Sequence, residues 1–301
     1  MQPTRTGPIV VATDFSDHAS AALDRALLLA RDQGRAVALV HALGLDVPAY
    51  WMGVIGEQWS LVERESEAYA RRRLEALAGR ARSEHGVEID IRLERGFASA
   101  SIASVSESLS ASLVVAGAHG AGLVHRLLMG STSSRLVRKC AGPVLVVKRR
   151  ADAPYRRALV PIDFSGASHE CIRMTLEHAP AAELTLLHAA AVPFGIQMRE
   201  AGISEDLIGT YEVAGREQGR ARLRQAARSA GLEPGGHAEV VVSGDPSHAI
   251  CSHAEAGEFD LIVMGKHGLH ITEHLLLGSV TKHVLAEADC DVLVVPSREA
   301  A

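Results

Sequence analysis

The chain has few residues of the kind on which small secreted proteins depend. Only four of its 301 residues are cysteines, Cys140, Cys171, Cys251 and Cys290, and no two of them form a Cys-x-x-Cys pair. This scarcity excludes a disulfide-rich scaffold and suits a reducing compartment. We expect the four thiols to be small buried side chains.

The sequence also lacks a long apolar run. No stretch reaches the roughly 18 consecutive apolar residues that a membrane span needs. The N-terminus has no charged segment followed by an apolar stretch and a cleavage site. These absences predict a cytoplasmic protein without a membrane partner.

Strong net charge is missing as well. Residues 1–150 hold 19 basic and 15 acidic side chains and residues 151–301 hold 12 and 21, which makes +4 and −9 and a total of −5. Neither half is basic enough to indicate a nucleic-acid partner. The opposite signs would help the two halves to dock, although drift on two solvated surfaces explains them equally well.

The chain does contain a glycine pattern that occurs twice. Gly-Ala-His-Gly at 117–120, nine residues and Gly-Ser at 130–131 recur as Gly-Lys-His-Gly at 265–268, nine residues and Gly-Ser at 278–279. The second copy lies 148 residues after the first, at position 265 against 117 and at position 278 against 130. Repetition at a fixed period indicates two copies of one structural unit.

Other landmarks keep this register. Asp-Phe-Ser at 14–16 recurs at 163–165, Leu-Val-His-Ala at 39–42 recurs as Leu-Leu-His-Ala at 186–189, and Gly-x5-Ile at 96–102 recurs at 244–250. The sequence therefore predicts two domains, 1–150 and 151–301, joined by a short linker at 148–154. Each has the usual length of a single-core unit.

Short apolar runs alternate with helical patterns within each copy. After an opening strand, we expect strands at 37–41, 88–95, 113–116 and 144–147, and their counterparts at 184–188, 238–243, 261–264 and 292–295. Helical spacing covers 19–30 and about 57–84 in the first copy, and 168–179 and about 207–230 in the second. Such alternation predicts an α/β fold in which each domain has a five-stranded parallel sheet with helices on both faces.

The glycine pattern follows the fourth strand of each copy directly. A loop leaving the carboxyl end of a parallel strand lies where α/β proteins bind ligands. Glycines allow close approach of the backbone to an oxyanion and positive φ, and the following helix N-terminus favours a phosphate. Hydroxyl donors accompany it: Ser131, Thr132 and Ser133 in the first copy, and Ser279 and Thr281 in the second, where Val280 replaces a hydroxyl. We expect Ser131 and Ser279 to cap these helices; the alternative is that the glycines only shape turns.

These motifs, in this order and twice, resemble the universal stress protein family over essentially the whole chain. The resemblance implies flavodoxin-like or Rossmann-like domains with strand order 3-2-1-4-5, paired with each other across their final strands. It also implies ATP binding, since the branch of the family with Gly-x2-Gly-x9-Gly-Ser binds ATP.

The resemblance assigns site residues position by position. Those that would hold ribose and phosphates are Gly117, Gly120, Gly130, Ser131 and Thr132 in the first domain, and Gly265, Gly268, Gly278 and Ser279 in the second. Asp14 and Asp163 match the family's acidic residue beside the nucleotide. Either could instead cap the helix that follows, or do both. Val40 and Leu187 stand at the second-strand position that lines the adenine pocket.

The two copies depart from each other at a few of these motif positions. Asp291 stands where the first copy has Pro143, and Phe-Ala at 97–98 replaces Asp-Pro at 245–246. The two sites are therefore expected to differ in affinity.

Other chemistry has little support in the sequence. His267, His270 and His274 lie at spacings that could suit Zn²⁺, but the first copy has no matching set, so we expect a solvated helix and no metal site. The Walker phosphate loop and the Gly-x-Ser-x-Gly elbow are both absent.

These observations predict a cytoplasmic tandem universal stress protein that binds ATP, with or without Mg²⁺, and has little or no catalytic turnover. Bound nucleotide would order the loop at 123–129 or 269–277 and alter a surface that a regulatory protein partner reads. Two alternatives remain open: a scaffold or interaction protein without nucleotide, and a slow ATPase that uses Asp14 and Asp163. An intramolecular pseudo-dimer is expected, and a homodimer is possible.

Overall fold

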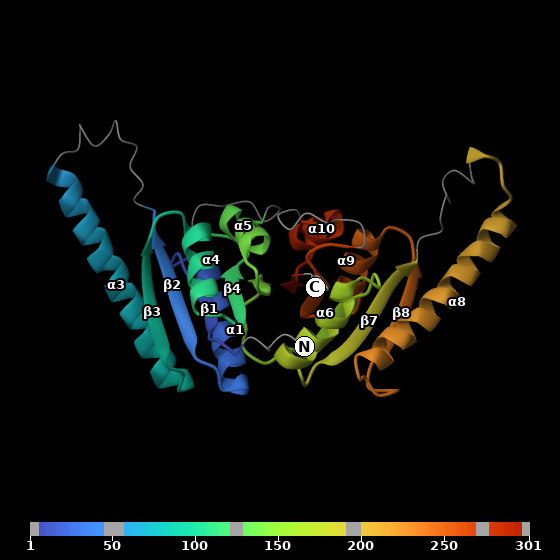
Figure 1. Cartoon of the computed structure of the whole chain (residues 1–301), viewed down its shortest axis with the longest axis horizontal. Helices are drawn as coiled ribbons and strands as arrows, with labels where there is room; N and C mark the ends of the chain where they lie inside the picture. Colours follow the sequence, from blue (N-terminus) through green and yellow to red (C-terminus); the bar gives the residue numbers. More distant parts are fainter. Residues whose placement is uncertain (1–5, 45–56, 121–128, 191–199, 269–276, 297–301) are drawn as a thin grey trace. The chain divides into compact units, whose positions relative to one another are not determined.

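The computed structural model describes residues 6–44, 57–120, 129–190, 200–268 and 277–296 (Figure 1). It divides into two compact units, Met1–Pro154 and Tyr155–Ala301, hereafter unit 1 and unit 2. The boundary between them lies at the C-terminal end of the segment 148–154, which we expect to be the linker. The expected pairing of the two domains across their final strands stays a prediction.

Unit 1 has the predicted α/β architecture. Its strands are β1 (Ile9–Ala12), β2 (Val37–Leu43), β3 (Ile89–Arg95), β4 (Leu113–Gly117) and β5 (Val144–Val147). Its helices are α1 (Asp17–Gln33), α3 (Glu57–His85), α4 (Ala98–Ser108) and α5 (Ser131–Lys139). The strands pair in parallel in the order β3-β2-β1-β4-β5, which confirms the predicted order 3-2-1-4-5.

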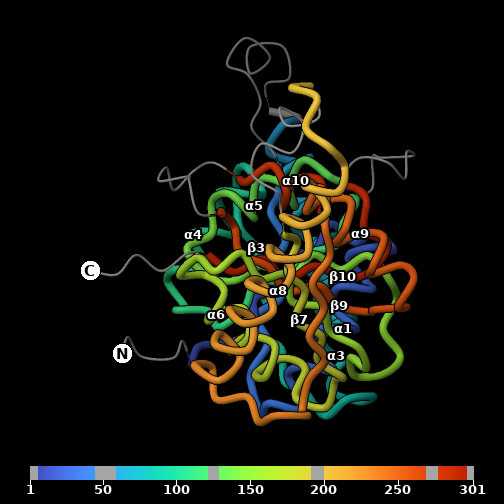
Figure 2. The backbone as a smooth tube through the Cα atoms, turned by 90° about the vertical axis from the view of Figure 1, so that its right-hand side faces the viewer, coloured from blue at the N-terminus to red at the C-terminus, as the bar shows by residue number. Residues whose placement is uncertain are grey.

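Unit 2 repeats the arrangement. Its strands are β6 (Arg157–Pro161), β7 (Glu183–Ala190), β8 (Ala238–Ser243), β9 (Leu261–Gly265) and β10 (Asp291–Val295). Its helices are α6 (Gly166–His178), α8 (Glu205–Ser229), α9 (Pro246–Ala256) and α10 (Ser279–Glu287). The strands are again parallel, in the order β8-β7-β6-β9-β10. Helix α8 runs along β7 and β8 (Figure 1) and faces the viewer in Figure 2.

The burial of the strands explains why this sequence forms sheets covered on both faces. All four residues of β1 and all five of β4 are buried, as expected of central parallel strands. Strand β3 at the sheet edge instead alternates, with Asp90 and Arg92 exposed. Helices α1 and α3 contact each other, as do α4 and α5, so each pair packs together against the sheet.

Most of the cysteines are buried in this fold, as expected. Cys140, Cys171 and Cys290 are buried and Cys251 is half-buried, and none of these four described cysteines forms a disulfide. Among the helices of the described residues, none is both long enough and apolar enough to cross a bilayer.

Candidate functional site

The glycine loop of each unit begins where the fourth strand of the sheet ends. Strand β4 ends at Gly117 and β9 at Gly265, and helices α5 and α10 begin at Ser131 and Ser279. The two ends of each loop are joined by a hydrogen bond, from Gly130 N to Ala118 O at 2.8 Å in unit 1. The corresponding bond in unit 2 runs from Gly278 N to Lys266 O at 3.1 Å. The parts of these loops at 121–128 and 269–276, which include most of the segments expected to respond to ligand, lie outside the described residues.

The helix starts differ from the prediction in one respect. Ser131 and Ser279 were expected to cap α5 and α10, but they are the first helical residues, and the cap positions belong to Gly130 and Gly278. A glycine cap has no side chain to bind the first amides of the helix. Those amides therefore remain available to an anion at the helix N-terminus.

A hydroxyl two residues further along ties each of these helices to the preceding strand. Ser133 donates to the carbonyl oxygen of Gly117 at 2.5 Å, and Thr281 donates to that of Gly265 at 2.9 Å. These bonds fix the helix N-terminus beside the end of the strand. A ligand phosphate would therefore meet a preorganised group of amides.

The glycines serve for close approach, and the expectation of positive φ is wrong for those of the loop that the structure describes. A Cβ added to Gly120 would lie 2.7 Å from Asp14 Oδ2, and one added to Gly268 would lie 3.2 Å from Asp163 Oδ2. Glycine thus lets each loop pass against the aspartate at the tip of the first strand. Positive φ occurs instead in the Gly-x5-Ile motif, at Gly96 (106°) and Gly244 (123°).

The two aspartates do not cap helices, which excludes the alternative role considered for them. The cap of α1 is Ser16, whose Oγ accepts from Ala19 N, and the cap of α6 is Ser165. Asp14 Oδ1 accepts from Ser16 N at 3.0 Å, so the carboxylate holds the turn before the helix.

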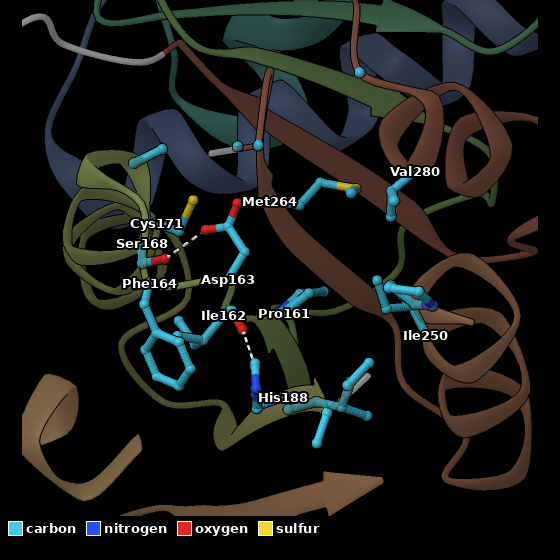
Figure 3. A pocket seen from close by; sticks show the side chains of 18 of the residues that line it. Pro161, Ile162, Asp163, Phe164, Ser168, Cys171, His188, Ile250, Met264 and Val280 are labelled. Carbon is cyan, nitrogen blue, oxygen red and sulfur yellow. Dashed lines mark hydrogen bonds between the residues drawn. The ribbon is translucent and has the colours of Figure 1, made fainter. Parts of the chain in front are cut away.

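Asp163 holds the same turn in unit 2 and has an additional partner. Its Oδ1 accepts from Ser165 N at 2.9 Å and from Ser168 Oγ at 3.0 Å, the second of which Figure 3 shows. Asp163 lies in the lining of the unit 2 cavity beside Cys171 (Figure 3). Burial, with a smaller contribution from the nearby Asp163, raises the pKa of the Cys171 thiol, so this cysteine is neutral.

A cavity of about 730 Å³ lies at this edge of unit 2. Every site residue predicted for the second domain lines it: Asp163, Leu187, Gly265, Gly268, Gly278 and Ser279. Apolar side chains such as Ile250 and Met264 line it as well (Figure 3). A concave, largely apolar space with a few convergent polar groups is typical of small-molecule sites.

The equivalent cavity of unit 1 measures about 400 Å³. Six of the seven residues predicted for the first domain line it: Asp14, Gly117, Gly120, Gly130, Ser131 and Thr132. The seventh, Val40, is fully buried in β2 and is not among the described residues of this lining, whereas His41 and Ala42 are. Of the two equivalent second-strand positions, Val40 and Leu187, only Leu187 therefore lines a described cavity.

The prediction missed an aromatic and cationic cluster, which occurs once in each unit. In unit 1 the ring of Phe15 lies 4.4 Å from that of His41, and the Arg73 guanidinium lies 5.0 Å from the Phe15 ring centroid. His41 Nδ1 donates to Thr13 O at 2.8 Å, which fixes the ring. The signal was present in the sequence, because the Phe and His belong to motifs that recur and an arginine recurs with them.

The same cluster in unit 2 consists of Phe164, His188 and Arg222. The two rings are again 4.4 Å apart, and the guanidinium lies 4.0 Å from the Phe164 ring centroid. His188 Nδ1 donates to Ile162 O at 2.8 Å (Figure 3). The phenylalanine of each unit has a left-handed backbone, with φ 65° at Phe15 and 64° at Phe164. Because such a backbone is strained for a bulky residue, its occurrence beside a cavity points to a functional role.

Histidines were also considered as metal ligands. His267 lines the unit 2 cavity, while His270 and His274 lie outside the described residues. Within the described ranges no group of three or more His, Cys, Asp or Glu side chains could hold a metal ion. In unit 1 burial, helped by the nearby His18 and Lys148, lowers the pKa of His119, which favours a neutral ring in the cavity lining.

The departures between the two copies have structural consequences. Asp245 caps α9 and accepts hydrogen bonds from Ser247 N and His248 N, whereas Phe97 at the start of α4 offers no side-chain cap. Asp291, which replaces Pro143, is buried and accepts from the Tyr155 hydroxyl at 2.7 Å. Both changes lie outside the phosphate-facing glycines.

A known protein family matches this chain once in each copy of the repeat. The model of the universal stress protein family matches residues 6–148 and again residues 154–296. A universal stress protein of Mycolicibacterium smegmatis is 26% identical to this chain, over 96% of this chain and 97% of its own length. One from Methanocaldococcus jannaschii is 30% identical, over 50% of this chain and 89% of its own. The crystal structure of a universal stress protein from Archaeoglobus fulgidus has a TM-score of 0.61 at 19% identity, covers 97% of this chain and 99% of its own, and shares the fold.

Proposed function

The chain belongs to the universal stress protein family, and from this premise we propose that it binds an adenine nucleotide, ATP, and acts as a nucleotide-responsive regulator or protective factor in the stress response. The observation that carries the proposal is the unit 2 cavity, which gathers all six residues predicted for that domain at one sheet edge. The triphosphate would lie against the amides at the start of α10. The ribose would lie beside the Asp163 carboxylate.

The residues present fit such a ligand. Glycine at positions 268 and 278 leaves space beside Asp163 and beside Lys266 O that a side chain would fill. The uncapped start of α10 supplies amide donors and the positive end of the helix dipole. Mg²⁺ would enter with the phosphates, as it usually does, because the described residues provide no cluster of three ligands for it.

We propose that the protein is not an enzyme. Phosphoryl transfer needs a group that orients the attacking nucleophile and cations that neutralise the developing charge. The acidic side chains of the two described cavity linings are Asp14 and Asp163, and both accept bonds from the turn before a helix. The proposal further includes a cytoplasmic location, a protein partner that reads the nucleotide state and an intramolecular pseudo-dimer with the option of a homodimer.

The direct test is mass spectrometry of the small molecules released when freshly purified protein is denatured. ATP or ADP in near-stoichiometric amount, or uptake of added Mg-ATP by calorimetry, is the expected result. The double variant Gly130→Asp with Gly278→Asp should abolish binding, because each new carboxylate faces the phosphate position. Unchanged affinity in a folded double variant would overturn the site, and failure of the wild type to bind any adenine nucleotide would favour a scaffold role.

A further inference from the structure

The two glycine-loop cavities differ in what lies at the end remote from the loop. The unit 2 cavity reaches helix α8, and its lining includes Gly215, Gln218, Gly219 and Arg222 of that helix. The described lining of the unit 1 cavity contains no residue of α3, the equivalent helix. This difference accompanies the difference in volume, about 730 Å³ against about 400 Å³.

Helices α3 and α8 can be aligned residue by residue. Arg73 and Arg222 each lie over the phenylalanine of the first motif, and the next residues, Leu74 and Leu223, are each fully buried. In this register, 149 residues apart, the glycines of α8 at 215 and 219 replace Ser66 and Ala70 of α3.

The glycine at 219 brings α8 close to the second strand of its unit. A Cβ at this position would lie 2.9 Å from His188 Cδ2 and 3.3 Å from Val241 Cγ1. The absence of a side chain therefore lets the helix backbone pack directly against the His188 ring. Gly215 and Gly219 both line the cavity, which therefore extends along the glycine face of α8.

The arginines of the two clusters have different surroundings. Arg73 donates from Nη1 to the Tyr69 hydroxyl at 2.8 Å and lies beside that ring as well, at 5.8 Å from its centroid. The residue equivalent to Tyr69 in unit 2 is Gln218, which is exposed and lines the cavity. Arg222 lies closer to its phenylalanine, at 4.0 Å against 5.0 Å, and lines the cavity too.

The exposed chemistry at the α8 end suits a nucleobase. Aromatic rings, imidazoles and guanidinium planes are the groups on which bases stack in proteins, and Phe164, His188 and Arg222 supply one of each. Leu187 and Ile250 add apolar surface to the same lining. In unit 1 the described lining includes His41 but neither Phe15 nor Arg73, so only one member of the equivalent cluster lines that cavity.

We propose that the chain holds a single adenine nucleotide, in unit 2, with the base at the Phe164–His188–Arg222 cluster and the phosphates at the start of α10. The inference rests on the proposed function and assigns it to one of the two sites. The unit 1 site keeps the same glycine loop, but the described lining of its cavity includes no side chain of α3. Arg222 and Gln218 then determine the specificity for the nucleoside end of the ligand.

The experiment is titration calorimetry of the nucleotide-stripped full chain with Mg-ATP, supported by native mass spectrometry. One bound nucleotide per chain is expected. Two equivalent sites would overturn the inference and leave the proposed function standing. The absence of any adenine-nucleotide binding would overturn both.

Substitution of the equivalent exposed arginines of α8 and α3 tests which unit binds the nucleotide. Arg222→Ala is expected to weaken ATP binding about tenfold, because the base loses the guanidinium plane on which it stacks. Arg73→Ala is expected to change it less than twofold. Equal losses in the two variants, or a loss only in Arg73→Ala, would overturn the assignment to unit 2.

A second pair exchanges the residues that distinguish the two helices. Gln218→Tyr gives unit 2 the side chain of unit 1 and is expected to weaken ATP binding about tenfold, whereas Tyr69→Gln should leave it within twofold. Unchanged affinity in Gln218→Tyr together with a loss in Tyr69→Gln would contradict the proposal. Binding of inorganic triphosphate measured alongside should be unaffected in all four variants, since only the base end is altered; an equal loss of triphosphate binding would show that Arg222 contacts the phosphates instead.

Discussion

Units 1 and 2 share the backbone arrangement of the glycine loop but differ in the side chains around it. In both, the strand end, the glycine cap and the hydroxyl tie from Ser133 or Thr281 are the same. The surrounding side chains differ on α3 and α8 and at the residues packed against the first loop glycine, which are His18 in unit 1 and Ala167 in unit 2. The comparison teaches that the backbone of a glycine loop can be duplicated intact while the side chains on the neighbouring elements diverge.

The space beside the first loop glycine is smaller in unit 1 than in unit 2. A Cβ on Gly117 would meet the backbone carbon and oxygen of His18, both at 2.7 Å, whereas a Cβ on Gly265 would meet the Ala167 Cβ at 3.0 Å. Gly117→Ala should therefore destabilise unit 1 by about 3 kcal/mol, and Gly265→Ala should cost about 1 kcal/mol in unit 2.

Urea unfolding measures both substitutions. The chain's two tryptophans, Trp51 and Trp59, both belong to unit 1, so their fluorescence follows that unit while circular dichroism follows both. Equal losses of unfolding free energy in the two variants would contradict this prediction, because the backbone of α1 would then move away from the new Cβ as easily as the Ala167 side chain does.

The buried pair of Tyr155 and Asp291 gives the next largest effect. Tyr155→Phe removes the hydroxyl that donates to Asp291 Oδ2 inside unit 2 and should cost about 2 kcal/mol of unfolding free energy. Unit 1 has Pro143 at the position of Asp291 and no equivalent bond to lose. The exposed Tyr211→Phe is the control, and a similar cost there would remove the distinction.

The helix caps of α9 and α4 form a third contrast. Asp245→Ala should cost about 1 kcal/mol because its carboxylate binds two amides, while Phe97→Ala at the equivalent cap should cost less than about 0.5 kcal/mol. Asp245→Asn should keep most of the stability, since asparagine is an equally good cap.

The Asp245 cap also predicts a pH dependence. The Ser247 side chain, followed by the His248 amide, lowers the pKa of Asp245 by hydrogen bonding. A lowered carboxyl pKa stabilises the folded state above the unfolded value, about 3.9, and this stability is lost as the pH falls through the folded value. Thermal unfolding of the wild type and of Asp245→Ala should therefore converge in acid, and a difference that grows on acidification would contradict the cap.

The smallest expected effect concerns the orientation of Asp163. Ser168→Ala removes one donor to Oδ1 and makes the position like Ala19 of unit 1, so ATP affinity should fall about threefold, or about 0.7 kcal/mol. The reciprocal Ala19→Ser should leave it unchanged. Calorimetry checks both variants, and a gain in Ala19→Ser would show that unit 1 takes part in binding.

Much of this architecture followed from the sequence because its signals are local or repeated. The strands are short apolar runs, the loop glycines follow a strand directly, and the 148-residue period gave each observation a second instance. The position of the loop glycines at the end of the fourth strand could therefore be predicted without a structure.

Other features could not be predicted because they depend on contacts between distant segments. The helix cap moved by one residue, from Ser131 to Gly130, a shift that only backbone angles decide. Val40 and Leu187 occupy equivalent strand positions, yet only Leu187 lines a described cavity, because the cavities differ in extent. Arg222 lies 58 residues after Phe164 in the chain, at 222 against 164, and only the packing of α8 brings the two together.

The left-handed backbone of Phe15 and Phe164 has a consequence for protein engineering. Glycine adopts this conformation freely, whereas a side chain there costs about 1–2 kcal/mol. Replacing either phenylalanine by glycine would relax the main chain and at the same time take the ring away from its histidine and arginine. At Phe164, where we propose that the base binds, selection for thermal stability and selection for ligand affinity would thus favour different residues, so stability and ligand binding would compete at this turn.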